Sequence, residues 1–278
     1  MLSPKALLSQ HGLRAKRSFG QNFLVDQALA RKIAAFVCPE QGGGLVEIGA
    51  GLGALTGPLL DRGARVTAIE RDRDLVPLLR QQFPEPIGSG VLRLVEADAQ
   101  TVDYEALLAD LPRPRRLCGN LPYQLSGPLL RRVAALGTQH IEGAVFLLQL
   151  EVVNRLLAPP GSGDYGAMSV FIQARFEARR RLVISRRAFY PVPRVDSALV
   201  ELTMLPVALS QETPAFRAVV KAAFLQRRKK LRNAWRGLLD RSDEQIARAA
   251  LRAKIDLDAR GETLDVTAFA RMAEEVRR

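Results

Sequence analysis

The chain has 278 residues, of which 47% are hydrophobic and 25% are charged, a normal balance for a globular protein with one sizeable core and a second, smaller unit. No apolar run approaches the ~20 residues that a membrane-spanning helix needs, and no signal sequence is recognisable. We therefore exclude a membrane protein and expect a soluble, non-exported, cytoplasmic one. The formal net charge of +12 indicates a polyanionic partner.

Cysteines and histidines are scarce. The two cysteines, Cys38 and Cys118, lie in apolar contexts, which predicts a reducing compartment and no disulfide framework. The two histidines, His11 and His140, have no cysteine or acidic companions at the spacing of metal ligands. The sequence therefore predicts no metal site.

Residues 1–25 form a basic N-terminal arm. We expect residues 1–15 to be a disordered tail, because their pattern is only weakly periodic. The later part of the arm carries the apolar residues Phe19, Phe23 and Leu24, which predict that it docks on the rest of the protein. Asp26 has the character of a helix N-cap, so we expect a helix that runs to about Cys38.

A buried-strand pattern at residues 45–48 leads into the glycine turn of residues 49–54, and a helix pattern follows. Strand, glycine turn and helix are typical of the start of a nucleotide-binding α/β sheet, and Gly49 and Gly51 let a ligand approach the backbone closely. The turn also satisfies the dinucleotide pattern in its G-x-G-x-x-A form, so a nicotinamide-dependent oxidoreductase stays open. Glu47, just before the turn, favours a cationic ligand over a pyrophosphate.

Three further predicted strands each end in a polar residue. These strands are residues 65–69, 91–95 and 116–119. Glu70 follows the first by a spacing that suits a ribose-binding carboxylate, although a surface charge at a strand end is the alternative. Asp98 follows the second and can accept an adenine amine, and Asn120 ends the third. Parallel strands deliver their carboxyl ends to one crevice, so we expect one ligand site there.

The stretch Asn120–Tyr123 reads Asn-Leu-Pro-Tyr. Pro122 forces the backbone to turn after the strand. The side-chain oxygen of Asn120 and the carbonyl of Leu121 can accept the two hydrogens of an exocyclic amine, while the Tyr123 ring stacks on the base. The alternative is an ordinary strand-ending turn with Tyr123 as a core aromatic.

A second aromatic candidate lies further along the chain. We predict strands at residues 143–148, 168–176 and 198–205. Between the last two, Phe189 precedes Pro191 and Pro193, which hold the segment extended. This segment can present Phe189 to the crevice; the alternative is a packed aromatic in a loop.

The pattern is helical after a linker at about residues 205–214. Residues 206–278 contain 16 lysines and arginines against 10 aspartates and glutamates, a net charge of +6. The candidate nucleic-acid-binding residues, which we call the basic segment, are Arg227, Arg228, Lys229, Lys230 and Arg232. A charge run is usually a solvated face, but this one is interleaved with Leu231 and Trp235, which favours nucleic-acid contact. We predict an α/β domain over residues 1–205 and a helical domain over 206–278 that binds nucleic acid.

Taken together, these motifs resemble the ribosomal RNA adenine dimethyltransferases of the KsgA type. The resemblance covers nearly the whole chain and depends on residues 20–26, 47–56, 69–72, 98–99, 120–123, 189–198 and 224–229. One departure is Ala50, where the family commonly has proline. It loosens the turn slightly and removes no ligand contact.

The resemblance implies a Rossmann-like class I methyltransferase sheet and S-adenosylmethionine as methyl donor. The cofactor-binding residues that it implies are Asn22, Leu24, Gly49, Gly51, Glu70, Asp98, Ala99 and Asn120. The catalytic residues are Asn120, Leu121, Pro122, Tyr123 and Phe189. The implied substrate is 16S rRNA in the small ribosomal subunit, at two adjacent adenosines of the 3′-terminal hairpin loop, each methylated twice, and we expect the enzyme to be a monomer.

Two closer alternatives share this chemistry or this surface. One is a 23S rRNA adenine N6-methyltransferase of the macrolide-resistance type, which would differ mainly in the C-terminal unit. The other is a ribosome-assembly factor with little catalysis, which would bind small subunits without adding methyl groups. Both roles can coexist in one protein.

Overall fold

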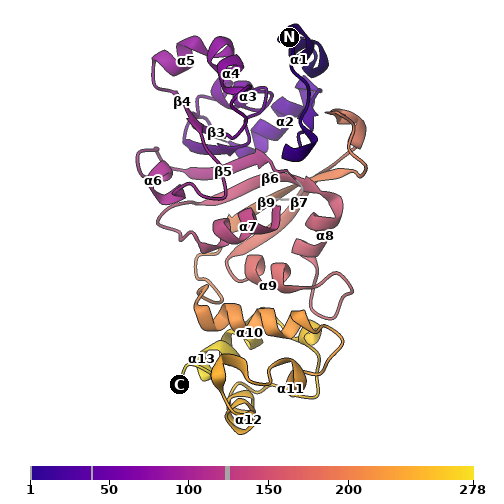
Figure 1. Cartoon of the computed structure of the whole chain (residues 1–278). Helices are drawn as coiled ribbons and strands as arrows, with labels where there is room; N and C mark the ends of the chain where they lie inside the picture. The colour runs from indigo at the N-terminus through magenta and orange to yellow at the C-terminus, as the bar shows by residue number, and fades with distance from the viewer. Residues whose placement is uncertain (1, 39, 123–125) are drawn as a thin grey trace. The chain divides into compact units, whose positions relative to one another are not determined.

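The computed structural model describes residues 2–38, 40–122 and 126–278 (Figure 1). The contacts within the chain divide it into two units. The first contains residues 1–153 and 179–204, and the second contains residues 154–178 and 205–278.

The first unit is built on a mixed sheet of seven strands. The strands are β2 (Gly44–Ile48), β3 (Arg65–Glu70), β4 (Leu92–Glu96), β5 (Arg115–Asn120), β6 (Gly143–Gln149), β7 (Phe176–Ile184) and β9 (Ser197–Met204). Their order is β4-β3-β2-β5-β6-β9-β7; β2 to β6 run parallel, and β9 is antiparallel to β6. This order reverses between β2 and β5, which places a ligand crevice at their carboxyl ends. The predicted α/β fold is confirmed.

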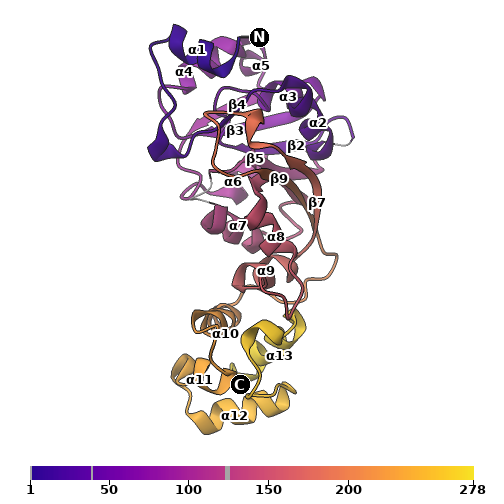
Figure 2. The same cartoon turned by 90° about the vertical axis from the view of Figure 1, so that its right-hand side faces the viewer.

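Helices cover the sheet of the first unit. They are α1 (Pro4–Gln10), α2 (Gln27–Val37), α3 (Thr56–Asp61), α4 (Val76–Gln82), α5 (Pro84–Gly88), α6 (Tyr104–Ala109), α7 (Ser126–Ala135) and α8 (Leu150–Leu157), which crosses into the second unit. The 3₁₀ turns η1 (Arg17–Phe19) and η2 (Arg186–Ala188) and a two-stranded ribbon of β1 (Phe23–Leu24) and β8 (Phe189–Tyr190) complete it. Figures 1 and 2 show α2 and α3 over one face of the sheet and α7 over the other.

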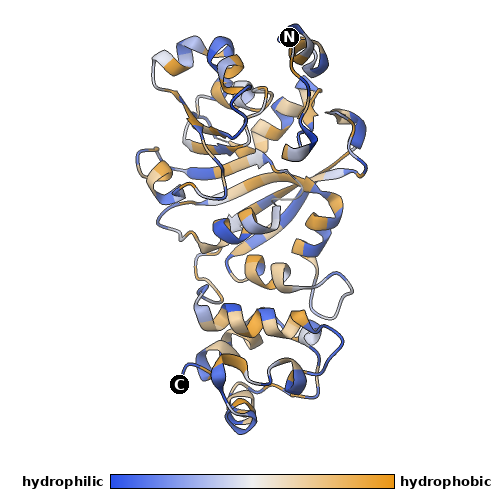
Figure 3. Ribbon diagram, viewed as in Figure 1, coloured by the Kyte–Doolittle hydropathy of each residue, from blue (hydrophilic) through white to orange (hydrophobic). Residues whose placement is uncertain are grey.

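Local sequence explains how the site-bearing elements begin and pack. The Asp26 carboxylate accepts hydrogen bonds from the backbone N–H groups of Ala28 at 2.8 Å and Leu29 at 3.0 Å, so the predicted N-cap of α2 is confirmed. All five residues of β2 are buried, as expected for a parallel strand covered on both faces. Figure 3 shows hydrophobic stretches along the middle of the sheet.

The predicted disordered tail is wrong for the described part of residues 1–15. Ser3 caps helix α1 by accepting a hydrogen bond from the backbone N–H of Ala6. Leu8 in this helix is buried in a small cluster with Leu52 and Leu75. A single well-placed leucine and a cap are enough to dock the helix, and neither gives a long periodic pattern.

The second unit is helical. Its elements are α9 (Ala167–Gln173), α10 (Pro214–Leu225), α11 (Leu231–Ala234), η3 (Leu238–Asp240), α12 (Asp243–Arg252), η4 (Gly261–Thr263) and α13 (Val266–Glu275). Its core includes the fully buried rings of Trp235 and Phe269. In the described residues no helix is both long and apolar enough to cross a membrane.

Two predictions about residues 154–178 need correction. The predicted strand at residues 168–176 is the helix α9, and β7 begins only at Phe176. Tyr165 and Phe171 lie in the hydrophobic core of the second unit, so this segment belongs there. The predicted boundary near residue 205 therefore marks one of the places where the chain passes between the units.

Candidate functional site

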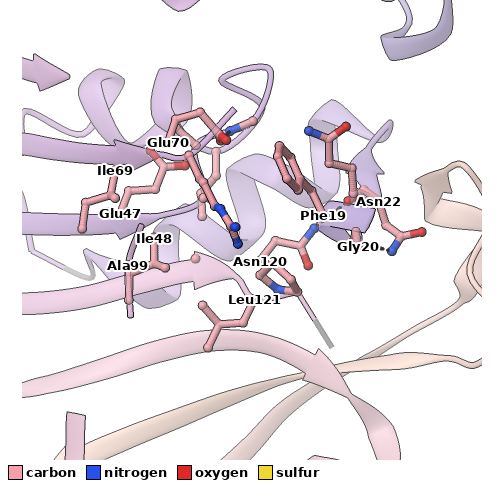
Figure 4. A pocket seen from close by; sticks show the side chains of 18 of the residues that line it. Phe19, Gly20, Asn22, Glu47, Ile48, Ile69, Glu70, Ala99, Asn120 and Leu121 are labelled. Atoms are coloured by element: carbon pink, nitrogen blue, oxygen red, sulfur yellow. Dashed lines mark hydrogen bonds between the residues drawn. The ribbon is translucent and has the colours of Figure 1, made fainter. Parts of the chain in front are cut away.

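A pocket lies at the carboxyl ends of β2, β3, β4 and β5 in the first unit (Figure 4). All eight residues predicted to bind the cofactor line it, together with Leu121 and Pro122 of the predicted catalytic stretch. The eight are Asn22, Leu24, Gly49, Gly51, Glu70, Asp98, Ala99 and Asn120. The parallel sheet brings six of them together, because its strands end at the same edge, and the N-terminal arm adds Asn22 and Leu24.

Glu70 is fixed by backbone donors at the end of β3. Its Oε2 accepts from the N–H of Gly51 at 2.7 Å, and its Oε1 accepts from the N–H of Asp72 at 2.7 Å. Gly51 has a φ of +59°, a backbone conformation that residues other than glycine rarely adopt. Burial raises the pKa of Glu70, and the hydrogen bonds from Asp72 and Gly51 oppose that rise. The carboxylate is thus held rigidly, with lone pairs left for a ligand's hydroxyl groups.

Glu47 is a buried carboxyl at the end of β2. Its Oε2 accepts from the Thr56 hydroxyl at 2.6 Å, and the side chain lines the pocket. Burial raises the pKa of Glu47 to about 7; the Thr56 hydrogen bond lowers it, and the charge of Glu70 raises it further. A cation in the pocket would lower this pKa again, so the site favours a positively charged ligand.

The loop after β4 presents Asp98 and Ala99 to the pocket. Asp98 accepts from the N–H of Gln100 at 2.9 Å and lies 3.4 Å from Nη1 of Arg71. Arg132 of α7 donates to the carbonyls of Gln100, at 2.5 Å, and Val102. Arg132 therefore holds the loop in place. No sequence pattern identified it, because Arg132 is 32 and 30 residues away in sequence from the two residues whose carbonyls it contacts.

Asn120 is oriented by the N-terminal arm. Its Nδ2 donates to the backbone carbonyl of Asn22 at 2.7 Å. A carbonyl can only accept, so this contact assigns the amide orientation and leaves Oδ1 of Asn120 as the acceptor for a ligand. Leu121 follows, with its N–H donating to the carbonyl of Leu147 at 3.1 Å. In Figure 4 the Asn120 and Leu121 side chains lie on the same side of the pocket as Gly20 and Asn22.

The ring of Phe189, one of the two predicted stacking rings, is not among the described residues that line this pocket. Phe189 is only 2% exposed and packs in the hydrophobic core of the first unit, because β8 pairs with β1 and sets Phe189 opposite Leu24. The structure therefore supports the packed-aromatic alternative for Phe189. Tyr123 lies outside the described residues, so its role stays a prediction.

Sequence reasoning missed several residues of the pocket's rim. Phe19 lines the pocket, with the Arg71 guanidinium 5.0 Å and the Lys16 ammonium 5.4 Å from its ring centroid. Gln21 lines it as well. Gln21 lies within residues 20–26, one of the motifs that carry the family resemblance, and Phe19 lies just before it. Only the fold shows what these two residues contact. Among the described residues, no three histidine, cysteine or acidic side chains gather as metal ligands.

The basic segment of the second unit divides into two kinds of residue. Arg227 pairs with Glu262 at 2.9 Å, while Lys230 and Arg232 both pair with Asp258. Arg228 and Lys229 are exposed, and within residues 2–38, 40–122 and 126–278 no ion pair is found for either. These two carry the uncompensated charge of the segment.

The apolar residues interleaved with these charges have a structural role. Leu231 and Trp235 are both fully buried. The Trp235 Nε1 donates to the carbonyl of Val219 at 2.9 Å, which satisfies its only polar group. The expectation that they favour nucleic-acid contact is therefore corrected: they anchor the segment to the core.

Comparison of the sequence with known proteins gives a consistent picture. A family model described as "Ribosomal RNA adenine dimethylase" matches residues 12–277. A relative from Anaeromyxobacter sp. (strain K), named Ribosomal RNA small subunit methyltransferase A, is 43% identical over 277 residues, which are 96% of this chain and 95% of the relative.

Two solved structures share the fold. A dimethyladenosine transferase from Plasmodium falciparum superposes with a TM-score of 0.72 at 20% identity, over 90% of this chain and 95% of that one. The 23S rRNA methyltransferase ErmE superposes with a TM-score of 0.63 at 26% identity, over 92% of this chain and 100% of that one.

Proposed function

Because the chain belongs to the ribosomal RNA adenine dimethylase family, we propose that it methylates N6 of two adjacent adenosines in the 3′-terminal hairpin loop of 16S rRNA, each twice, with S-adenosylmethionine as donor. The contact from Asn120 Nδ2 to the Asn22 carbonyl carries this proposal, because it leaves an amide oxygen ready for an amine. The name of the 43% identical relative supports the small subunit as the target.

The pocket residues fit this donor. When bound, S-adenosylmethionine supplies a methyl group on a positively charged sulfur, and the electron pair of the broken carbon–sulfur bond stays with sulfur. Glu47 and Glu70 give the pocket the negative charge that suits such a cation. Glu70 would accept from the ribose hydroxyls, and Asp98 would accept from the donor's adenine amine.

Asn120 and Leu121 would prepare the acceptor amine. The lone pair of an adenine amine is delocalised into the ring, so the amine is a weak nucleophile. Oδ1 of Asn120 and the carbonyl of Leu121 would accept its two hydrogens and draw the nitrogen toward tetrahedral geometry. The lone pair can then form the new nitrogen–carbon bond, and water takes the released proton. Positioning and fixed dipoles supply most of the rate.

The RNA-binding role of the second unit belongs to the same proposal. Arg228 and Lys229 would contact phosphates directly, and Arg227, Lys230 and Arg232 would add charge that is partly neutralised. Tyr123 would stack on the everted base, which is cheaper to unstack from a loop than from a duplex. We further propose that the enzyme acts as a cytoplasmic monomer and takes part in small-subunit biogenesis.

Methyl transfer to purified ribosomal subunits tests the proposal. Small subunits lacking these methyl groups should accept four methyls from labelled S-adenosylmethionine, mapping as dimethyladenosine at the two loop positions. Incorporation elsewhere, or binding of a nicotinamide dinucleotide instead of S-adenosylmethionine in calorimetry, would overturn it. An Asn120→Ala variant that still binds small subunits separates an assembly role from catalysis.

One observation favours a second candidate. The 23S rRNA methyltransferase ErmE has the same fold over nearly the whole chain at 26% identity. A parallel assay with large subunits or 23S rRNA distinguishes the two, because a large-subunit enzyme would label that RNA and leave the small subunit unmodified. The higher identity to the small-subunit relative makes 16S rRNA our first choice.

A further inference from the structure

Residues 16–24, which we call the strap, run along the rim of the donor pocket. Residues 18–24 of the strap line the pocket, and Figure 4 shows Phe19, Gly20 and Asn22 beside Asn120, with the Asn22 amide bonded to the Gly20 carbonyl. At its C-terminal end the strap is held twice, by the β1–β8 ribbon and by the hydrogen bond from Asn120 to Asn22. What fixes the N-terminal end decides whether the strap stays on the pocket.

That N-terminal end is tied to Asp72, just beyond β3. The Lys16 ammonium donates to Oδ1 of Asp72 at 2.5 Å, and the Gln21 amide donates to Oδ2 at 2.7 Å. The Lys16 backbone N–H in turn donates to the Gln21 side-chain oxygen at 2.8 Å, so the two residues that contact Asp72 are also bonded to each other. Asp72 is only 2% exposed, and both of its oxygens are used.

The groups around Asp72 stabilise its charged form. Burial alone would raise the pKa of Asp72, but the hydrogen bonds from Lys16, Gln21 and the Asp74 N–H, together with the Lys16 charge, outweigh it and hold the pKa below its ordinary value. Asp74 also accepts from the Lys16 ammonium, at 2.6 Å, but it is 42% exposed, and the Gln21 amide donates to Asp72 instead. A buried charge needs its partner more than an exposed one does, so Asp72 is the dominant anchor.

Asp72 is also connected to the ribose-binding end of the pocket. Its backbone N–H donates to Glu70, whose other oxygen accepts from Gly51. One short turn therefore carries the carboxylate proposed to hold the donor and the carboxylate that holds the strap. Any donor that orders this turn through Glu70 also orders the anchor of the strap.

We propose that Asp72 is a positioning residue for donor binding, which holds the strap on the pocket through Lys16 and Gln21. This inference rests on the proposed function, in that the pocket's ligand is taken to be S-adenosylmethionine. Asp72 is not among the described residues that line the pocket, so it would act through the strap. Its loss should weaken donor binding and leave the methyl-transfer step nearly intact, because Asn120 keeps its own contact with Asn22.

The test compares Asp72→Asn with the matched variant Asp74→Asn. The first removes the buried charge and places an amide donor against Lys16 or Gln21, while the second removes only the exposed partner of the same lysine. Calorimetry with S-adenosylhomocysteine should give a Kd about tenfold weaker for Asp72→Asn and no more than about twofold weaker for Asp74→Asn. Turnover at saturating donor should stay within about threefold for both.

Hydrogen exchange gives an independent readout without any ligand. The strap amides of Phe19 and Gly20 donate to the carbonyls of Lys16 and Arg17 at 3.1 and 3.0 Å, so they exchange faster when the strap opens. Asp72→Asn should speed their exchange about tenfold and leave β2 unchanged. Lys16→Gln, a change at a half-buried side chain, should do the same, and combining it with Asp72→Asn should add little further effect.

The possible outcomes distinguish a failure of the proposed role of Asp72 from a failure of the proposed function. Unchanged strap exchange and unchanged affinity in Asp72→Asn would overturn the anchor. A Kd that is unchanged while only the melting temperature falls would also overturn it, since that is what a purely structural role gives. If the wild-type protein binds no S-adenosylhomocysteine, the proposed function fails, and the exchange comparison still decides whether Asp72 holds the strap.

Discussion

The donor pocket of the first unit and the basic segment of the second use charge in opposite ways. In the pocket, Glu47 and Glu70 are buried and each has a fixed hydrogen-bond donor. In the basic segment, Arg228, Lys229 and Lys230 are exposed, and only some of the cations are paired. The first arrangement defines geometry, and the second supplies long-range attraction.

Single substitutions should therefore have unequal effects in these two regions. A buried group with fixed partners cannot be replaced by a neighbour, so its loss should have a large and specific effect. An exposed cation in a cluster is partly redundant and screened by salt, so its loss should have a small effect that depends on ionic strength.

Asn120→Ala should give the largest effect. It removes the amide whose Nδ2 is held by Asn22 and whose Oδ1 would accept from the substrate amine. By analogy with the loss of one preorganised hydrogen-bonding group, the single-turnover rate should fall by about 10²–10³-fold. Rapid-quench measurement of methyl transfer at saturating donor and small subunit gives this rate directly.

Two controls show whether a slower rate in Asn120→Ala comes from the methyl-transfer step. The far-UV circular dichroism of Asn120→Ala should match the wild type, and its affinity for small subunits should be unchanged. A single-turnover rate within about threefold of wild type would rule out the proposed role of Asn120.

The pH dependence of stability should come next in size. Burial raises the pKa of Glu47 to about 7 from 4.5, so the folded protein binds a proton that the unfolded chain has already lost. The stability that this provides is fully present below about pH 4.5 and is lost as the pH rises through about 7, a change of about 3 kcal/mol. Urea denaturation of wild type and Glu47→Gln between pH 5 and 8 measures it.

The difference between the two stability curves isolates Glu47, because every other titrating group is common to both proteins. Wild type should lose stability over this interval relative to Glu47→Gln. Parallel curves would contradict the burial argument. Donor binding near pH 7 should also release a proton from Glu47, which calorimetry in two buffers of different ionisation enthalpy detects.

The sequence predicted the pocket well because its signals are local. Strand patterns followed directly by Glu70, Asp98 and Asn120 need only the rule that parallel strands end at one edge. The six predicted cofactor residues that follow these strands line the pocket for that reason, whereas Asn22 and Leu24 reach it from the N-terminal arm and were predicted through the family resemblance. The functional roles of these residues remain predictions until the variants are measured.

The features that sequence reasoning missed depend on distant partners. Phe189 is buried because β8 pairs with β1, about 165 residues earlier, and Asp72 gains its meaning only from Lys16, 56 residues away. The helix α9 was mistaken for a strand because a short apolar run fits either periodicity. Trp235 lies among cations in the sequence but inside the core in space.

A pair of glycine substitutions contrasts a strand tip at the pocket with the protein surface. A Cβ on Gly119 would lie 2.2 Å from the backbone carbonyl oxygen of Ile48, in the adjacent strand. A Cβ on Gly88, in the short helix α5, would meet nothing within 4 Å. Backbone cannot yield as a side-chain tip can, so Gly119→Ala should destabilise the protein by about 1–3 kcal/mol.

Gly88→Ala serves as the matched control and should be neutral or slightly stabilising, by up to about 1 kcal/mol. Thermal and urea denaturation of both variants measure the difference. Equal stabilities would show that β2 and β5 separate easily at the pocket, and would weaken the view that the site is rigid.

The smallest expected effects are in the basic segment, where the two kinds of cation can be told apart. If about six phosphates are neutralised, the slope of log affinity against log salt concentration for small-subunit RNA should be roughly −4 to −5. Arg228→Gln should reduce its magnitude by about 1. Lys230→Gln should reduce it by less, because the Lys230 ammonium already lies 2.9 Å from Asp258. Filter binding over a salt series gives the three slopes; a flat wild-type slope would mean that the segment faces solvent alone, and equal reductions would mean that RNA displaces Asp258.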